Sequence, residues 1–449
     1  MSKIDNAGAF KLISFNISKD GANVDATNIV HMFSIQESMS LNSIRGSAKI
    51  YDSTGLLYTF PLTGEETIDI EYSDWFGDVR KDTMFLYAIT DVKPSKEADS
   101  NTLGMTLHFV SKTKFLANRR MVRKSYTGLI STIAGDLFDA FYDADPIQIE
   151  GTTGFQRLSI PNMLPDDAMN FLSRRAYSSE DESSMIRFFE NRNGHFFMSP
   201  GYYARNVSGE PLTYGYNALP DQTGEGQLNM MSQLIEIDFN ETVNTIADLN
   251  DGNYNASTIE LDILKRQVEH NQYKYLDEYQ AYTYPNGTVS SRHNKSFMDE
   301  SAIDPHVTVI LKDYGDPDAS QYPGLRPNTY EHKTYTHKYA AYHHLNANKI
   351  FVKIYGRNSI VAGSTIDLDL PKFMKDSNNI AIDPLWSGRY FIEAVDNVFF
   401  EDTYTQSLTL SKSGVSNLPE PPSNVPYMLN ETNADVDKPN INDYIAGQI

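Results

Sequence analysis

"SGRYFIEAVDNVFFEDTYTQSLTLSKSG", residues Ser387–Gly414, is the most strongly patterned stretch of the sequence and is rich in aromatic and β-branched residues. Within it, Tyr404, Leu408 and Leu410 alternate with hydroxyl-bearing residues, which is the period of a β-strand with one buried face. The stretch contains no nucleophile motif, no set of metal ligands and no phosphate-binding loop. It therefore predicts antiparallel β structure without a catalytic centre.

A related pattern lies near the start of the chain. Three motifs occur in the same order in both regions: "TIDIE" at 67–71 and "TIDLD" at 365–369, Y-x-I-x-x-V at 87–92 and 390–395, and "LHFVSK" at 107–112 and "LTLSK" at 408–412. Such a series predicts that one antiparallel β-barrel has been duplicated. The alternative is chance, because strands draw on a small set of residue types. With duplication, a ring of three subunits would present six similar barrels and approach sixfold symmetry.

Composition limits the class of protein. The 449 residues, with 40% hydrophobic and 12% aromatic content, predict a folded chain of about two to four domains. The chain has no Cys, which excludes disulfides, thiolate zinc sites and cysteine nucleophiles and fits synthesis in a reducing cytoplasm. A net charge of -21 opposes wrapping of nucleic acid. No signal segment and no apolar run of bilayer length is present, so we expect a soluble, unprocessed chain without membrane insertion.

The pattern along the chain predicts a mainly β fold with α+β insertions, in which two similar antiparallel β-barrel domains belong to a multidomain chain. A helix is predicted within 125–142 and another within 165–177, followed by a hairpin that turns at Asn193-Gly194. The predicted domains are a first β-barrel (1–117), an α+β middle domain (118–230), a second β-barrel (231–265 and 345–417), an insertion belonging with the middle domain (266–344), and an extended Pro-rich arm (418–449).

The collinear motifs carry a family resemblance. They are "NAGAFKLISFNISKDG", "AMNFLSRRAYSS", "LNDGNYN", "VKIYGRNSIVAGSTIDLDLP" and "SGRYFIEAVDNVF" followed by "YTQSLTLSKSG". Over about residues 5–415 the chain resembles the baseplate hub subunit of contractile-tailed bacteriophages and, more distantly, the hub portion of type VI secretion spike proteins. The order of these motifs carries the resemblance, because each motif alone is loose.

The resemblance implies a homotrimer of duplicated barrels with a defined set of neighbours. It would join the hexameric tail tube protein to the trimeric central spike protein, contact baseplate wedge proteins, and let DNA pass only in transit through its centre. The location implied is the tail baseplate of the virion, after assembly in the cytoplasm of the host bacterium.

Paired carboxylates are the strongest candidates for chemistry. Asp69 and Glu71 share one strand face, as do Asp367 and Asp369. Two acids flanking a bond would suit glycoside hydrolysis. Solvent-facing positions explain them better, because alternation demands polar residues there. Facing a lumen is the third interpretation, which the resemblance implies.

Two further clusters contain side chains that can bind metal ions. Asp248, Asn250, Asp251 and Gly252 suggest a calcium loop, but the glycine falls one position early and position twelve is Ile259, so a turn is predicted. Four histidines, His332, His337, His343 and His344, lack the H-E-x-x-H spacing and are expected to be surface or interface residues.

The remaining motif searches are negative. The sequence has no G-x-S-x-G, no dinucleotide loop and no G-x-x-x-x-G-K-[ST]. We therefore predict a structural protein, not an enzyme, with no catalytic residue, cofactor or metal. The alternatives are a cell-wall glycosidase and a receptor-binding tail protein.

Overall fold

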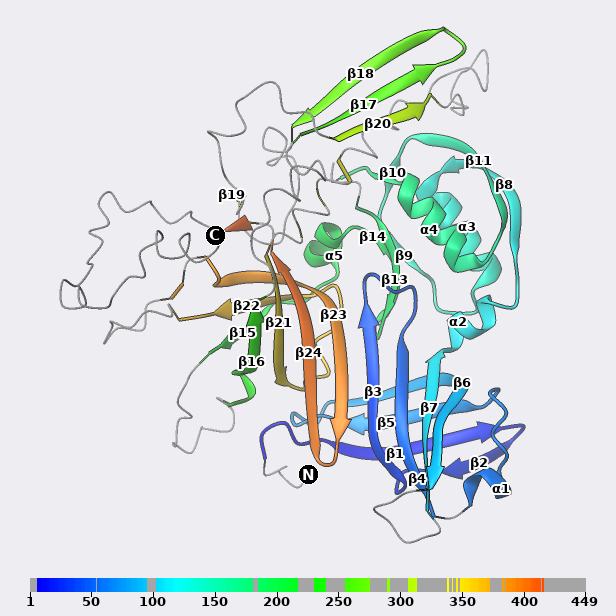
Figure 1. Cartoon of the computed structure of the whole chain (residues 1–449), viewed down its shortest axis with the longest axis vertical. Helices are drawn as coiled ribbons and strands as arrows, with labels where there is room; N and C mark the ends of the chain where they lie inside the picture. Colours follow the sequence, from blue (N-terminus) through cyan, green and yellow to red (C-terminus); the bar gives the residue numbers. More distant parts are fainter. Residues whose placement is uncertain are drawn as a thin grey trace, which may run out of the picture.

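The computed structural model describes residues 6–53, 55–94, 102–180, 185–216, 230–239, 255–274, 289–290, 306–312, 337–338, 341, 345, 348–371, 382–383, 385–412 and 414–415 (Figure 1). Most of these residues lie in strands, and one sheet contains 13 of the strands. The fold is therefore mainly β with helical insertions, as the sequence predicts. The Pro-rich arm 418–449 lies outside the described residues.

The strands nearest the amino terminus form what we call the first β unit. Its order in the sheet is β3-β4-β7-β6-β5-β1-β2, and every neighbouring pair is antiparallel. A short helix, α1, connects β4 to β5. The bounds are β1 Lys11–Lys19, β2 Ala22–Asp25, β3 Val30–Ser38, β4 Arg45–Asp52, α1 Leu56–Thr59, β5 Thr67–Ser73, β6 Val79–Pro94 and β7 Leu103–Ser111.

A second β unit follows much later in the chain. Its order is β16-β21-β24-β23-β22-β15, and only the β15–β22 pair is parallel. The first five strands repeat β3-β4-β7-β6-β5, so the predicted duplication is confirmed in topology. The bounds are β15 Leu212–Gly215, β16 Leu234–Phe239, β21 Asn348–Tyr355, β22 Thr365–Asp369, β23 Gly388–Phe400 and β24 Thr403–Lys412.

The two units also agree in register. A β-bulge adds one residue to a strand and shifts its pairing, so a bulge marks one position along a strand. Both units carry bulges in corresponding strands. The bulge between Leu86 and Ala88 in β6 matches the one between Ile392 and Ala394 in β23. The bulge between Val30 and Met32 in β3 matches the one between Leu234 and Glu236 in β16. The sequences "VHMFSI" at 30–35 and "LIEIDF" at 234–239 align in this register.

One predicted motif match is correct and another is wrong. Thr67 of "TIDIE" faces Phe85, and Thr365 of "TIDLD" faces Phe391, so these two segments are equivalent. The Y-x-I-x-x-V match is out of register by three residues, because the bulges make Ala88 equivalent to Ala394. Accordingly Tyr87 is 51% exposed, whereas Tyr390 is fully buried.

The two β units are joined edge to edge and are not separate closed barrels. Strand β23 of the second unit pairs with β3 of the first, which makes one continuous sheet (Figure 1). The strand order ends at β16 and at β2. Among the described residues, the two ends of the second unit meet only at an isolated bridge between Gly215, the last residue of β15, and Gln233, just before β16. We call the β23–β3 pairing the junction.

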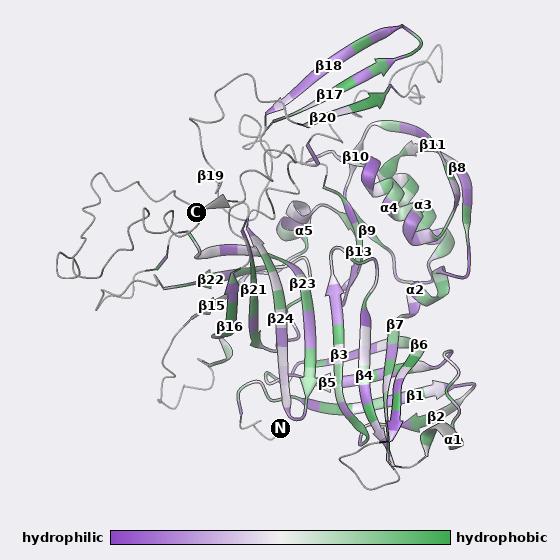
Figure 2. Cartoon of the chain, viewed as in Figure 1, coloured by the Kyte–Doolittle hydropathy of each residue, from purple (hydrophilic) through white to green (hydrophobic). Residues whose placement is uncertain are grey.

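Each unit encloses its own core. Figure 2 shows hydrophilic and hydrophobic residues alternating along the strands of the sheet, which gives one polar face and one buried face. In the first unit Phe15, Ile68 and Ile70 are fully buried, and Phe399 and Tyr404 of the second unit join the same cluster. The junction therefore shares apolar contacts as well as backbone pairing.

The middle segment, residues 112–206, packs a third core against the sheet. Buried Ile130, Ile133 and Leu137 form the apolar stripe of α3. Helix α4 begins at Pro165, and two aspartates in its first turn favour the helix dipole. Both predicted helices are confirmed. The bounds are α2 Lys112–Ala117, β8 Val122–Leu129, α3 Ile130–Phe141, β9 Gln148–Ile149, β10 Thr152–Thr153, β11 Phe155–Met163, α4 Pro165–Arg175, β12 Tyr177–Ser178, β13 Arg187–Asn191, β14 Gly194–Met198 and α5 Pro200–Asn206.

A separate three-stranded sheet has the order β18-β17-β20. The sequence assigns residues 255–262 to the second barrel, but they belong to this small sheet. Alternation shows that a strand has two faces, but it does not show which strand it pairs with. The bounds are β17 Asn255–Asp262, β18 Gln267–Lys274 and β20 His306–Leu311, with a further two-stranded pair of β19 Val289–Ser290 and β25 Gly414–Val415. Among the described residues, no helix is long and apolar enough to cross a bilayer.

Candidate functional site

The junction between the β units is the candidate functional site. Pairing runs from Ala394 opposite Ser38 to Phe400 opposite Met32. The ring of Phe399 stacks on that of Phe33 with 4.2 Å between centroids. Cross-strand aromatic pairs of this kind stabilise a sheet beyond the area they bury. The junction is therefore a well-packed interface between two copies of one module.

Buried amide side chains complete the polar contacts of the junction. The Asn397 amide donates to the Ile35 carbonyl oxygen at 2.9 Å, and its own oxygen accepts from the Tyr404 hydroxyl at 2.7 Å. The Gln406 amide donates to the same Asn397 oxygen at 2.9 Å. Asn397 and Gln406 are fully buried. Because buried polar groups are costly unless satisfied, this network fixes the pairing of the two units.

The tip of the hairpin β13–β14 enters the junction. The Arg192 guanidinium donates from Nε to Glu37 at 2.9 Å, and both side chains are 0% exposed. The same guanidinium donates to the Tyr72 hydroxyl at 3.1 Å and to the Ile360 carbonyl at 2.8 Å. One side chain thus joins β3, β5 and the connection between β21 and β22. This geometry locks the middle segment to both β units.

A second contact crosses between the units beside the hairpin. Asp74, in the turn between β5 and β6, is fully buried, and its Oδ2 accepts the Asn358 backbone N–H at 2.9 Å. Its Oδ1 accepts the N–H groups of Phe76 and Asp78, each at 3.0 Å. Burial raises the pKa of Asp74 above its usual value. The turn is held on the second unit by these bonds.

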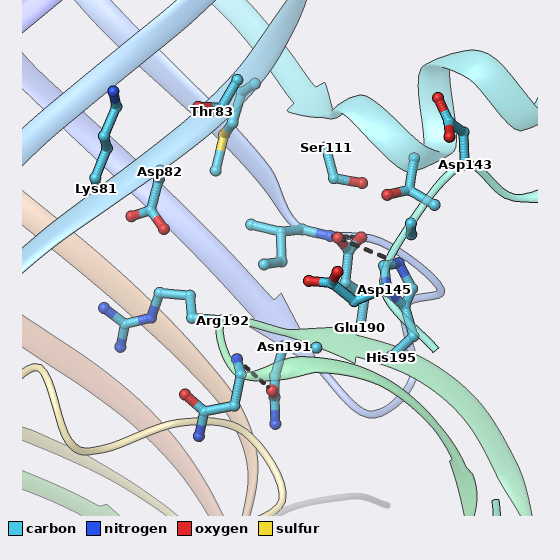
Figure 3. Close-up of a pocket in the computed structure, with 16 residues that line it drawn as sticks. Lys81, Asp82, Thr83, Ser111, Asp143, Asp145, Glu190, Asn191, Arg192 and His195 are labelled. Atoms are coloured by element: carbon cyan, nitrogen blue, oxygen red, sulfur yellow. Dashed lines mark hydrogen bonds and ion pairs between the residues drawn. The ribbon is translucent and has the colours of Figure 1, made fainter. Parts of the chain in front are cut away.

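A polar cavity of about 650 Å³ lies where β6 meets the hairpin β13–β14 (Figure 3). It is lined by Lys81 and Asp82 of β6, by the connection 143–145, and by Glu190 and His195 of the hairpin. In the described part of the chain, no group of three or more acidic or histidine side chains is arranged to hold a metal ion. The side chains that face the cavity include both acids and bases.

The four predicted carboxylates lie elsewhere. Asp69 and Asp367 occupy equivalent positions on the polar face of the sheet, and none of the four acids lines the cavity. Asp69 accepts from the Thr83 hydroxyl at 2.5 Å. Arg389 donates to Asp367 through two bonds, at 2.9 and 3.1 Å. Asp367 is therefore satisfied by a structural ion pair.

We expect these acids to have no hydrolytic role. Replacing Asp69, Glu71, Asp367 and Asp369 together by Asn or Gln should leave peptidoglycan hydrolysis at background in a zymogram. The stability change should be less than about 1 kcal/mol for each site, because exposed pairs contribute little. A clearing band in the natural protein that disappears in the fourfold variant would establish the glycosidase alternative.

The other predicted clusters fall mostly outside the described residues. His332, His343 and His344 and the loop 248–252 are among the undescribed residues. His337 is buried, with its ring centroid 4.4 Å from that of Tyr273. It therefore packs against aromatic rings inside the chain, those of Tyr273 and Tyr177.

The buried role of the charged residues in the hairpin was not predicted from the sequence. A signal was present in "FFENRNGHFF" at 188–197, where charged residues interrupt an aromatic hairpin and must find buried partners. The partners could not be named, because Glu37 lies 155 positions from Arg192.

Known proteins resemble this chain in structure and not in sequence. No protein-family model and no curated protein matches the sequence. A tail protein from Neisseria meningitidis MC58 matches in structure with a TM-score of 0.51 and 10% identity, covering 90% of this chain and 97% of that chain. The 43 kDa tail protein of prophage MuSo2 from Shewanella oneidensis matches with a TM-score of 0.52 and 7% identity, over 88% and 97%. The chain therefore shares the fold of these two tail proteins.

A third match is weaker. A component of the type VI secretion system from E. coli gives a TM-score of 0.40 and 9% identity, covering 92% of this chain and 77% of that chain.

Proposed function

We propose that the chain is a structural hub subunit of a phage tail baseplate. Three copies form a ring of six β units, which joins the hexameric tail tube to the trimeric central spike and encloses the channel that DNA crosses. One observation supports this most strongly: the chain contains two copies of one β unit and already joins them through a strand junction. Repeating that junction between subunits would generate a ring, provided that the rotation closes.

The edges needed for a second junction are present. Past Phe85, β6 has no strand on the side that β5 occupies earlier. Gln233 forms a bridge to Gly215 of β15, but from Leu234 onward β16 has no strand on its outer side among the described residues. Unpaired edges with exposed apolar side chains favour association with another strand. Val92 on β6 is 48% exposed and Ile235 on β16 is 43% exposed. Copying the junction would place β6 of one subunit beside β16 of the next.

The internal junction also supplies the register. Val398 faces Ser34 there. In the contact between subunits, Lys93 takes the position of Val398, because Lys93 pairs with Gly104, Val398 pairs with Thr405, and these two partners are equivalent. On the other strand, Asp238 takes the position of Ser34. Lys93 of one subunit would then face Asp238 of the next, and both are exposed. Opposite charges across a strand pair favour this register.

A cysteine pair tests the second junction, and the chain provides a background without Cys. Under mild oxidation Lys93→Cys/Asp238→Cys should give covalent oligomers on a non-reducing gel, because facing Cβ atoms come within reach of a disulfide. The matched control, Ser34→Cys/Val398→Cys, should give an intramolecular bond and run as a single chain on the same denaturing gel. If the first pair stays monomeric while the purified protein is a trimer, the edges are joined differently from this proposal.

The partners follow from the ring. The polar face continues across the junction, where Gln36, Asp396 and Ser407 are neighbours in register, and we assign this face to the channel. Wedge proteins would surround the ring in the baseplate of the virion.

Light scattering of the purified chain, alone and mixed with the tube and spike proteins of the same phage, tests this function. We expect a trimer that binds both partners. A monomer that binds neither would exclude the hub.

A further inference from the structure

Glu190 and His195 face each other across the hairpin β13–β14. Glu190 Oε1 and His195 Nε2 are 3.4 Å apart, and the residues are 7% and 8% exposed. Figure 3 shows both side chains in the wall of the cavity. An imidazole and a carboxyl at this distance can hold one proton between them.

The pair also contacts the first β unit. Glu190 Oε2 accepts the backbone N–H of Ile44 at 3.2 Å, in the connection between β3 and β4. The Ser111 hydroxyl, at the end of β7, donates to the same carboxyl group. One side chain of the hairpin therefore holds two separate elements of the first β unit.

Charged groups surround the pair on every side. The acids are Glu37 of β3, Asp82 of β6, Asp143 and Asp145 of the connection after α3, and Asp166 of α4, and the bases are Lys81 of β6, Lys114 of α2 and Arg192 of the hairpin. Glu37 is paired with Arg192, and Asp166 with Lys114 and with the Tyr142 hydroxyl. Carboxylates outnumber cations here, so a further negative charge is unfavourable.

Burial acts on the two groups in opposite directions. It raises the pKa of Glu190 to about 7 and lowers the pKa of His195 to about 4. In the folded chain the carboxyl is therefore protonated and the imidazole neutral in mildly acidic solution. The pair holds one proton and carries no charge.

We propose that Glu190 and His195 form a one-proton latch, which keeps the hairpin seated on the first β unit and loosens it when that proton is lost. The neutral pair avoids the cost of burying a charge. After deprotonation Glu190 is a buried anion. The Ile44 and Ser111 donors favour the carboxylate, but its loss of hydration outweighs them and Asp166 and Glu37 add repulsion, so keeping the hairpin seated then costs free energy. The latch holds the hairpin on the first β unit in acidic and neutral solution and weakens this contact above neutral pH.

Opposite pH slopes of two variants test the shared proton. In Glu190→Gln only His195 titrates, and its lowered pKa means that stability is lost as pH falls from 6.5 towards 4. In His195→Gln only Glu190 titrates, and its raised pKa means that stability is lost as pH rises from 4.5 towards 7. Relative to the natural protein, the folding equilibrium constant should fall about tenfold to hundredfold towards low pH in Glu190→Gln and towards high pH in His195→Gln.

The double variant Glu190→Gln/His195→Gln should show neither slope. The control His31→Gln, on the exposed surface of β3, should follow the natural protein. Urea unfolding at several pH values measures all of these constants. Parallel pH profiles for the two single variants would overturn the proposal.

Hydrogen exchange gives a second readout that tests the latch rather than global stability. Protection of the Ile44 amide, corrected for the intrinsic rate, should fall between about pH 6.5 and 8.5 in the natural protein. Glu190→Gln keeps an oxygen that accepts from Ile44, so its protection should not depend on pH. Protection that stays constant in the natural protein over this range would also overturn the proposal.

Discussion

Replacing Leu408 by Asp should destabilise the chain by about 4–5 kcal/mol and prevent ring formation. Leu408 is 1% exposed on β24, where it faces Val352 on one side and Val395 on the other. The new carboxylate would be buried in an apolar core without a partner. Urea unfolding followed by circular dichroism measures the loss, and size-exclusion chromatography follows assembly.

Two matched variants show whether the position is the cause. Ser407→Asp places the same charge on the neighbouring polar face, between Lys353 on one side and Asp396 on the other, and should cost less than about 1 kcal/mol. Leu107→Asp is the equivalent change in the first β unit, where Leu107 is fully buried, and it should cost as much as Leu408→Asp. A soluble, correctly assembled Leu408→Asp protein would show that the strand faces are assigned incorrectly.

Replacing Arg192 by Met should cost about 3–5 kcal/mol, because Glu37 is left as a buried charge without its partner. The hairpin should also detach from the junction, since the bonds to Tyr72 and Ile360 are lost with the guanidinium. Limited proteolysis should then cut the middle segment faster. Chemical unfolding gives the energetic cost.

The double variant Glu37→Gln/Arg192→Met isolates the ion pair from the packing. Removing both charges should recover a large part of the loss, because no ion remains buried. If the double variant is as unstable as the sum of the two single variants, the Arg192–Glu37 pair makes no net contribution and the hairpin is held by packing alone.

Much of the fold could be predicted from local patterns. Alternation in "TIDIEYS" and "TYTQSLTL" identified strands and their buried faces, since Ile68, Ile70 and Leu408 are all in the core. The spacing of Ile130, Ile133 and Leu137 identified α3. The match of "TIDIE" with "TIDLD" gave the correct register of the repeat, because both segments pair with their neighbours in the same way.

The features that could not be predicted from the sequence, strand register and distant partners, depend on bulges and long-range contacts. The bulges at Tyr87 and Glu393 shift strand register, so the Y-x-I-x-x-V motif aligned residues that are not equivalent. Pairing of β23 with β3 joins segments far apart in the chain, and no local pattern specifies such a partner. For the same reason the buried pair of Glu37 and Arg192 could not be predicted, although its charged residues stood out in an aromatic hairpin.

Electron cryo-microscopy of the purified protein, viewed along the axis of the particle, tests the central claim most directly. If one β unit is used twice per chain, three subunits should enclose a channel with six lobes, in which internal junctions alternate with β6–β16 contacts between subunits. Particles of a single chain, or rings in which the edges of β6 and β16 face solvent, would contradict the account.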